Sequence, residues 1–151
     1  MHFRAARSDE ADRLTGIVMA AKARWGYSPA QLEAWRPELA ISSALLQEQL
    51  VYVLEDGASI LGLYSLRMDA NRCELDNFWI APGAMGHGHG RALLAHACER
   101  AREMGAVEMH IDADPNAAPF YLKCGAVTTD HVAAAISGDP DRRRPQMRLR
   151  L

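Results

Sequence analysis

The chain has 151 residues, of which 49% are hydrophobic, and this is enough apolar material for one buried core. Its formal net charge of −2 argues against general binding to nucleic acid or anionic membranes, since both need a basic excess. The three cysteines show no C-x-x-C spacing, which disfavours a disulfide framework and a structural zinc site. With no apolar run near the roughly 18 residues of a membrane span, we expect one cytoplasmic domain over residues 1–151.

The first fifty residues are expected to hold a short strand and two helices. Residues 2–6 alternate like a strand, and Ser8 is the expected N-cap of the first helix. The apolar positions of this helix have helical spacing and comprise Leu14, Ile17, Val18 and Ala21. After the aromatic RWGY segment, residues 29–39 predict a second, shorter helix that ends at Pro37.

From residue 50 the apolar period becomes that of strands. Residues 50–56, 59–68 and 73–82 are separated by short turns, which predicts a three-stranded antiparallel meander. A helix follows and ends at Gly105. Its apolar stripe comprises Leu93, Leu94, Ala97, Ala101 and Met104.

The last third alternates strands with a short helix. Residues 106–114 are expected to form a buried strand, 116–125 a helix, and 126–134 and 145–151 the final strands. A strand–helix–strand crossover within a meander predicts an α/β (α+β) fold. We expect a mixed, mostly antiparallel sheet of six to seven strands with about four helices on its faces. For the arginine run at 142–144 we favour a solvated loop over a recognition patch.

The stretch GAMGHGHGR, residues 83–91, directly precedes the third expected helix, whose first turn is predicted near Arg91. Gly86, Gly88 and Gly90 recur at every second position, and glycines let a backbone approach an anion closely. A helix N-terminus adds unpaired N–H groups and partial positive charge. The stretch therefore predicts a phosphate cradle, with a ligand-free turn as an equally weighted alternative. It is neither a Walker A motif nor a G-x-G-x-x-G fingerprint.

Histidines within this region also raise the question of a metal site. His87 and His89 are one residue apart, and His96 lies more than a helical turn away. No cysteine or carboxylate stands at the usual ligand spacing, so we predict no metal and favour polar loop residues that can donate to an anion.

Taken together, these segments resemble the GCN5-related N-acetyltransferase (GNAT) family. Its shared motif runs Arg/Gln-x-x-Gly-x-Gly/Ala, and Met85, Gly88 and Gly90 fall on it, with Met85 departing from the usual Arg or Gln. The first helix, the RWGY loop, the meander, the glycine motif and DPNAAPFYLKCGA follow the family order over nearly the whole chain. The resemblance implies a GNAT-like acyl-CoA N-acyltransferase fold and direct transfer of acetyl from acetyl-CoA to a primary amine of a small molecule or peptide.

The resemblance also implies roles for individual residues. The N–H of Ile80 would polarise the thioester carbonyl, and Tyr121 would be the general acid unless it only packs beside Phe120. Asn116 would contact the coenzyme arm, or cap the following helix. The implied coenzyme-binding residues are Ile80, Met85, Gly86, His87, Gly88, His89, Gly90, Arg91, Asn116, Phe120 and Tyr121.

Two acids are candidates for the general base. Glu74 and Asp76 alternate along one strand, so both project from the same face, which either lines the cleft or faces solvent. His110 and Asp112 are further cleft candidates, although a structural histidine is favoured. The acceptor pocket is implied beside the first two helices, where Trp25, Tyr27 and Trp35 either bind the acceptor or cover the core.

The alternative function is a non-catalytic acyl-CoA-binding sensor or partner module of the same fold. Met85 favours this alternative, whereas Tyr121 and the two strand acids favour the enzyme. We expect acetyl-CoA and an amine as the partners of a monomer or homodimer; a metal-binding or nucleic-acid-binding protein is the least favoured class.

Overall fold

A seven-stranded mixed sheet organises the molecule. In the computed structural model, which describes residues Met1–Leu151, the strand order is β1-β2-β3-β4-β5-β7-β6. Every neighbouring pair is antiparallel except β4 and β5, which run parallel. The strands are β1 (His2–Ala5), β2 (Leu50–Asp56), β3 (Ser59–Asp69), β4 (Arg72–Ile80), β5 (Glu108–Asp112), β6 (Val127–Ala133) and β7 (Arg143–Arg150). The predicted sheet is confirmed.

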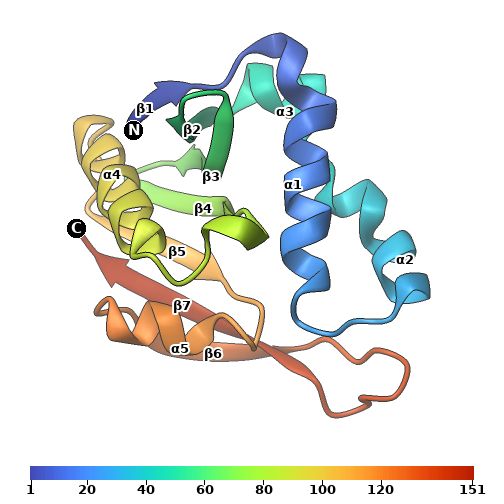
Figure 1. Cartoon of the computed structure of the whole chain (residues 1–151). Helices are drawn as coiled ribbons and strands as arrows, with labels where there is room; N and C mark the ends of the chain where they lie inside the picture. The colour runs from blue at the N-terminus through green and yellow to red at the C-terminus, as the bar shows by residue number, and fades with distance from the viewer.

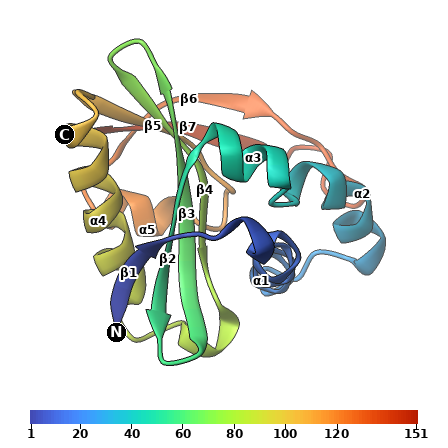
Figure 2. The same cartoon turned by 90° about the horizontal axis from the view of Figure 1, so that it is seen from above.

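Helices cover both faces of this sheet (Figures 1 and 2). One face carries α1 (Ala11–Ala23), α2 (Pro29–Leu39) and α3 (Ser43–Glu48), and the other carries α4 (His89–Glu103) and α5 (Ala118–Lys123). Two 3₁₀ helices, η1 (Ser8–Glu10) and η2 (Pro82–Ala84), precede α1 and α4. There is one α-helix more than expected, because α3 is too short for its apolar residues to show a period. None of the helices has the length and apolarity needed to cross a membrane.

The sheet separates two apolar cores of unequal size. The larger has 18 buried residues, among them Leu93 and Leu94 of α4 and Met109 of β5. The smaller has six, including Leu14 and Val18 of α1. Because each fully buried aliphatic side chain contributes about 1.5–3 kcal/mol, the larger core holds α4 firmly on the sheet and fixes its N-terminus in place.

β4 carries a bulge that changes which way its last residues point. Asp76 is an extra residue opposite the Ser65–Leu66 step of β3, as the shift in register shows. Leu75 and Phe78, on either side of the bulge, therefore pack on the same α4 face, where strict alternation would separate them.

β4 and β5 stay paired for only three residues. Their register runs from Arg72 opposite Glu108 to Glu74 opposite His110. β5 then continues only along β7, as far as Asp112 opposite Gln146. The second half of β4 therefore lacks a parallel neighbour in the middle of the sheet.

Two predictions at the ends of α1 and α2 are wrong. Ser8 begins η1, and Glu10 is the N-cap of α1. The Glu10 carboxylate accepts hydrogen bonds from Arg4 at 2.6 Å and from the N–H of Arg7 at 2.7 Å, and this contact with β1 fixes the helix start. α2 continues past Pro37 to Leu39, because a proline in the last turn removes only one ladder bond.

The predicted ends of α4 and β7 also differ from the structure. α4 begins at His89, two residues before Arg91, because Gly88 takes the left-handed conformation as its N-cap. Met104 follows the helix and is exposed, so it does not belong to the buried stripe. β7 begins at Arg143, two residues before the expected residue 145.

We expect Gly62→Ala to lower the free energy of unfolding by about 1–3 kcal/mol through overpacking. A Cβ at Gly62 of β3 would lie 2.8 Å from the carbonyl oxygen of Trp79 and 2.9 Å from Cδ1 of Ile80. The matched control is Gly16→Ala in α1, where nothing lies within 4 Å and alanine should stabilise by about 1 kcal/mol. Urea unfolding measures both; equal midpoints would contradict the close approach of β3 and β4.

Candidate active site

A cavity of about 900 Å³ opens where β4 and β5 part. The ends of α1 and α2 form one side of it, the second half of β4 and the turn before α4 form another, and β5 and α5 close it. Its volume falls within the range of small-molecule and cofactor sites. The cavity is therefore the candidate active site.

The turn between η2 and α4 presents its backbone to this cavity. Gly86 and Gly88 both have φ of +80°, a left-handed conformation that glycine adopts without strain. The hydrogen-bond ladder of α4 begins with the Ala92 N–H, which donates to the Gly88 carbonyl at 3.3 Å. The first N–H groups of the helix are consequently free for a ligand. The turn residues that line the cavity are Met85, Gly86, Gly88, His89, Gly90 and Arg91.

Two further histidines, His87 and His96, lie outside the cavity lining. His87 does not line the cavity and stacks beside His89 with ring centroids 5.9 Å apart. His96 lies on the middle of α4, where Nδ1 shares a hydrogen bond with the Tyr64 hydroxyl at 2.8 Å. His96 therefore belongs to the packing of α4 on the sheet.

Aromatic rings from α5 and β4 lie next to the glycine turn. A Cβ at Gly90 would lie 3.3 Å from the Phe120 ring, so glycine permits α4 to approach α5. Phe120 stacks on Phe78 with centroids 5.7 Å apart, and Tyr121 lies edge-on to Phe78 at 5.9 Å. Tyr121 is 5% exposed, and burial raises the pKa of its hydroxyl far above the ordinary value. It therefore keeps its proton at neutral pH.

Amide groups of β4 point into the gap between β4 and β5. The N–H of Ala81 donates to the Leu61 carbonyl of β3 at 2.9 Å. Because N–H directions alternate along a strand, the N–H groups of Ile80 and Phe78 point the opposite way, toward the missing neighbour. The amide of Ile80 is thus joined by that of Phe78, two residues earlier on the same edge, which sequence reasoning did not name.

Glu74 and Asp76 both line the cavity, but their surroundings differ. Glu74 accepts hydrogen bonds from Arg72 at 3.1 Å through Oε1 and contacts Nδ1 of His110 at 2.5 Å through Oε2. Asp76 is exposed in the bulge and accepts a hydrogen bond from Gln49 at 2.7 Å. His110 and Asp112 of β5 line the cavity as well.

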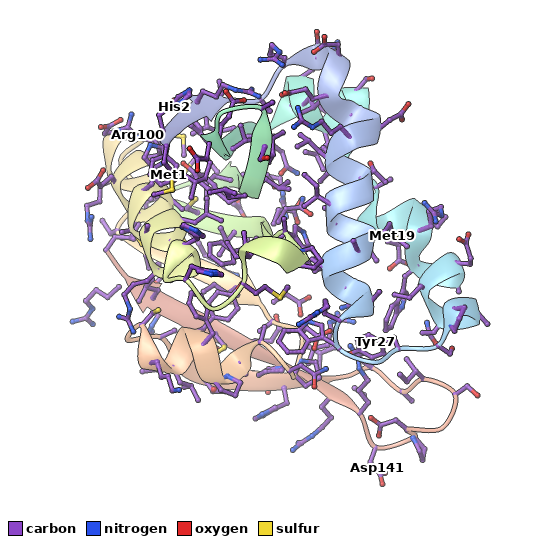
Figure 3. The ribbon with its side chains drawn as sticks, viewed as in Figure 1. Met1, His2, Met19, Tyr27, Arg100 and Asp141 are labelled. Atoms are coloured by element: carbon purple, nitrogen blue, oxygen red, sulfur yellow. The ribbon has the colours of Figure 1, made fainter.

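The opposite end of the cavity contains a buried ionic network that sequence reasoning missed. Lys22 of α1 donates to Asp114 at 2.6 Å, and the Arg142 guanidinium lies 3.6 Å from the same carboxylate oxygen. The Tyr27 hydroxyl donates to Asp114 at 2.8 Å and accepts from Arg142 at 3.1 Å. Figure 3 shows Tyr27 at the end of α1, beside the chain that leads into β7.

The predicted acceptor-binding aromatics enclose a lysine of the protein itself. Lys22 Nζ lies 4.8 Å from the Trp35 ring centroid and 5.1 Å from that of Tyr27, distances at which cation–π attraction operates. Trp25 and Trp35 line the cavity, whereas Tyr27 stands outside its lining. Trp25 is 43% exposed at the rim and is the aromatic residue most open to a ligand.

The prediction of a solvated loop at 142–144 is wrong. Arg142 is 7% exposed and lies 5.2 Å from the Trp35 ring, and Arg144 donates to Asp112 at 2.9 Å. Burial of Arg142 is tolerated because the Asp114 carboxylate lies beside it, and the partly exposed Arg144 pairs with Asp112. The usable signal was the pair of acids in the HIDAD segment, although nothing in the sequence assigns them to these arginines.

Asn116 also lies outside the lining of the cavity. Its side-chain amide donates to Asp114 at 3.0 Å and to the Tyr27 hydroxyl at 3.2 Å. The N-cap of α5 is Ala117, so the capping alternative for Asn116 is wrong. The side chain of Asn116 is instead hydrogen-bonded to the Asp114 carboxylate.

Comparison with solved structures places the fold among the GNAT acyltransferases. A GCN5-related N-acetyltransferase from Rhodopseudomonas palustris superposes with a TM-score of 0.81 at 24% identity, covering 99% of this chain and 95% of that chain. PaiA N-acetyltransferase from Thermoplasma acidophilum, solved with coenzyme A, gives 0.81 at 19% identity over 99% and 98%. The yncA protein of Salmonella typhimurium, solved with acetyl-CoA, gives 0.71 at 22% identity over 100% and 94%.

A comparison of the sequence with family models agrees with the structural comparison. The Acetyltransferase (GNAT) family model matches residues 17–126, and the chain therefore belongs to this family of acetyltransferases. Comparison with curated protein sequences gave no match. The family resemblance stated above is confirmed.

We expect Asp114→Asn to lower the free energy of unfolding by about 3 kcal/mol at pH 7, because it leaves buried cations without a charged partner. Burial by itself would raise the pKa of Asp114, but the hydrogen bond and charge of Lys22 hold that pKa below its usual range. Such a carboxyl stabilises the fold above its unfolded pKa of about 3.9 and loses this effect as pH falls.

The difference between wild type and Asp114→Asn should therefore shrink below about pH 4, as urea unfolding at several pH values will measure. The control is Asp141→Asn, at an exposed position labelled in Figure 3. Its free energy of unfolding should equal that of wild type at every pH. A constant difference from pH 7 to pH 3 would contradict a native ionic pair.

Proposed function

We propose that the protein transfers the acetyl group of acetyl-CoA directly to a primary amine of a small molecule or peptide. The observation that carries this proposal is the row of free amides from Gly86 to Arg91, which lines a 900 Å³ cavity beside unpaired amides of β4. Membership of the GNAT family supports the reaction class.

The residues present fit the coenzyme part of acetyl-CoA. The Gly86–Arg91 amides and the partial positive charge of the α4 N-terminus suit its pyrophosphate. Phe78 and Phe120 supply an apolar wall for the pantetheine arm. When bound, acetyl-CoA supplies an activated acyl group as a thioester. Two solved relatives in the same fold hold coenzyme A or acetyl-CoA, which supports this assignment.

The protein contributes polarisation and proton transfer. The N–H groups of Ile80 and Phe78 are the donors that would stabilise negative charge on a carbonyl oxygen in the gap. Tyr121 lines the cavity and carries its hydroxyl proton at neutral pH, as tyrosine ordinarily does, so it would be the donor to the departing thiolate. Preorganised donors of this kind need no reorientation during the reaction.

The acceptor would enter on the side of α1 and α2. Five acids line that part of the cavity, and they are Glu38, Glu74, Asp76, Asp112 and Asp114. Of the five cations that line the cavity, Arg91 belongs to the glycine turn. The other four, Lys22, Arg67, Arg142 and Arg144, leave the rest of the wall with one more acid than cation. An amine that arrives as a cation fits this balance, and Trp25 offers it an exposed ring.

A second candidate is an acyl-CoA-binding sensor without turnover. Met85 lines the cavity where the family motif has Arg or Gln, so one side-chain donor toward the coenzyme is missing. A sensor would bind acetyl-CoA and acetylate no amine. Turnover therefore separates the two candidates.

We expect calorimetric titration to show binding of acetyl-CoA and much weaker binding of acetyl-pantetheine, which lacks the pyrophosphate. Gly88→Val should lower the affinity for acetyl-CoA at least tenfold, because a branched side chain at φ of +80° distorts the turn. Gly138→Val, with φ of +84° far from the cavity, is the matched control and should bind like wild type. Equal affinities for both ligands in the wild type would contradict the cradle.

We expect Tyr121→Phe to reduce acetyl transfer by about 10²–10⁴-fold while the affinity for acetyl-CoA changes little, because only the proton donor is removed. A thiol-release assay over a panel of amines, with calorimetry in parallel, measures both quantities. Tyr52→Phe is the matched control, since Tyr52 lies on β2 outside the cavity lining. Unchanged transfer by Tyr121→Phe would remove this residue from the chemistry.

A further inference from the structure

The geometry points to His110 as the proton acceptor for the incoming amine, with Glu74 as its positioning residue. This inference rests on the proposed acetyl transfer and assigns the general base of that same site. It differs from a base role for Glu74 or Asp76 alone, because the atom that takes the proton is a ring nitrogen of β5.

The two side chains meet at the point where the strands part. Glu74 and His110 are the last paired residues of β4 and β5, and directly opposite residues on a sheet face are close neighbours. Nδ1 of His110 lies 2.5 Å from Oε2 of Glu74, and both side chains are more than 80% buried. Both line the cavity, so the pair faces the space in which the amine would react.

Arg72 fixes the carboxylate from its other side. Its Nε and Nη2 lie 3.1 and 2.9 Å from Oε1 of Glu74, and this two-point contact restricts rotation of the carboxylate. An ionised carboxylate accepts hydrogen bonds only, so Nδ1 of His110 carries the proton. Nε2 then bears the lone pair, and it makes no hydrogen bond to any protein atom.

The neighbouring acids are less suited to this role. Asp76 is exposed and accepts a hydrogen bond from Gln49, and Asp112 is held by Arg144. Asp114 is paired with Lys22. A carboxylate already engaged by a cation is a weaker base than an imidazole with a free nitrogen.

Charged groups surround the pair from each neighbouring strand. Beyond Glu74 and Arg72 of β4, Arg67 of β3 lies opposite Glu74, and Arg148 of β7 lies opposite His110. Asp112 of β5 acts on His110 from the same strand. Glu74 alone of these groups contacts the ring directly, through Nδ1.

Each proton released in the transfer has an acceptor. An amine that arrives as a cation first loses one proton to solvent. As the neutral nitrogen forms its bond to the acyl carbon, a second proton passes from it to Nε2 of His110, and Glu74 stabilises the resulting imidazolium. The thioester C–S bond breaks, and the thiolate takes a proton from Tyr121. Solvent then removes the proton from His110 and restores that of Tyr121, leaving the amide and the free thiol.

The test is steady-state kinetics of His110→Ala and His110→Gln with an amine that the wild type acetylates. We expect kcat/KM to fall by about 10²–10⁴-fold, mostly in kcat, with unchanged affinity for acetyl-CoA. Added imidazole should restore part of the activity of His110→Ala only. His131→Gln, at an exposed position of β6, is the matched control and should keep wild-type rates.

Glu74→Gln separates positioning from proton transfer. It should retain more activity than His110→Ala, and the acidic limb of its kcat/KM profile should move to lower pH, because the imidazolium loses its anionic partner. A change confined to stability would leave the profile in place and overturn the positioning role.

The outcomes distinguish this inference from the proposed function. Wild-type protein that binds acetyl-CoA but acetylates no amine overturns the proposed function and the role of His110 together. Wild-type turnover with unimpaired His110→Gln, or with no rescue of His110→Ala by imidazole, overturns the role of His110 alone.

Discussion

The separation of β4 from β5 is the constraint on which the site depends. Strands at the centre of a sheet normally satisfy the backbone groups of both neighbours, and an unpaired buried amide is costly. Here pairing stops at Glu74 and His110, and the bulge at Asp76 changes the direction of the strand just beyond. The amides of Phe78 and Ile80 are left without a strand partner, so a bound ligand or water must satisfy them.

Different forces hold the two ends of the resulting cavity. Apolar packing of α4 against the sheet fixes the glycine turn, in which Gly86 and Gly88 have no side chains to anchor it. At the acceptor end, Lys22, Asp114 and Arg142 form a buried ionic network. Buried ion pairs add little net stability but tolerate few alternative arrangements. They therefore set the position of α1 relative to β5 and β7 without large gains in stability.

The ion pairs and hydrogen bonds of the site that the sequence did not reveal share one cause, which is that the two partners are distant in the chain. Lys22 and Asp114 are 92 residues apart, and Arg142 and Tyr27 are 115 apart. A local reading of three arginines gives a solvated turn, because nothing nearby compensates their charge. The same holds for Glu74 and His110, which are 36 residues apart and meet only through strand pairing.

The element types, the mixed sheet, the family and a glycine turn before α4 could all be predicted from the sequence, and phosphate binding by that turn stays a prediction. Those signals are local: apolar periods of two or 3.6 residues, and glycines before a helix. The bend of β4, the amides left unpaired beyond it and the acid that each cation contacts follow from long-range packing and could not be predicted. A one-residue bulge reverses the faces of a strand without a mark in its composition, and long-range ion pairs depend on strand order.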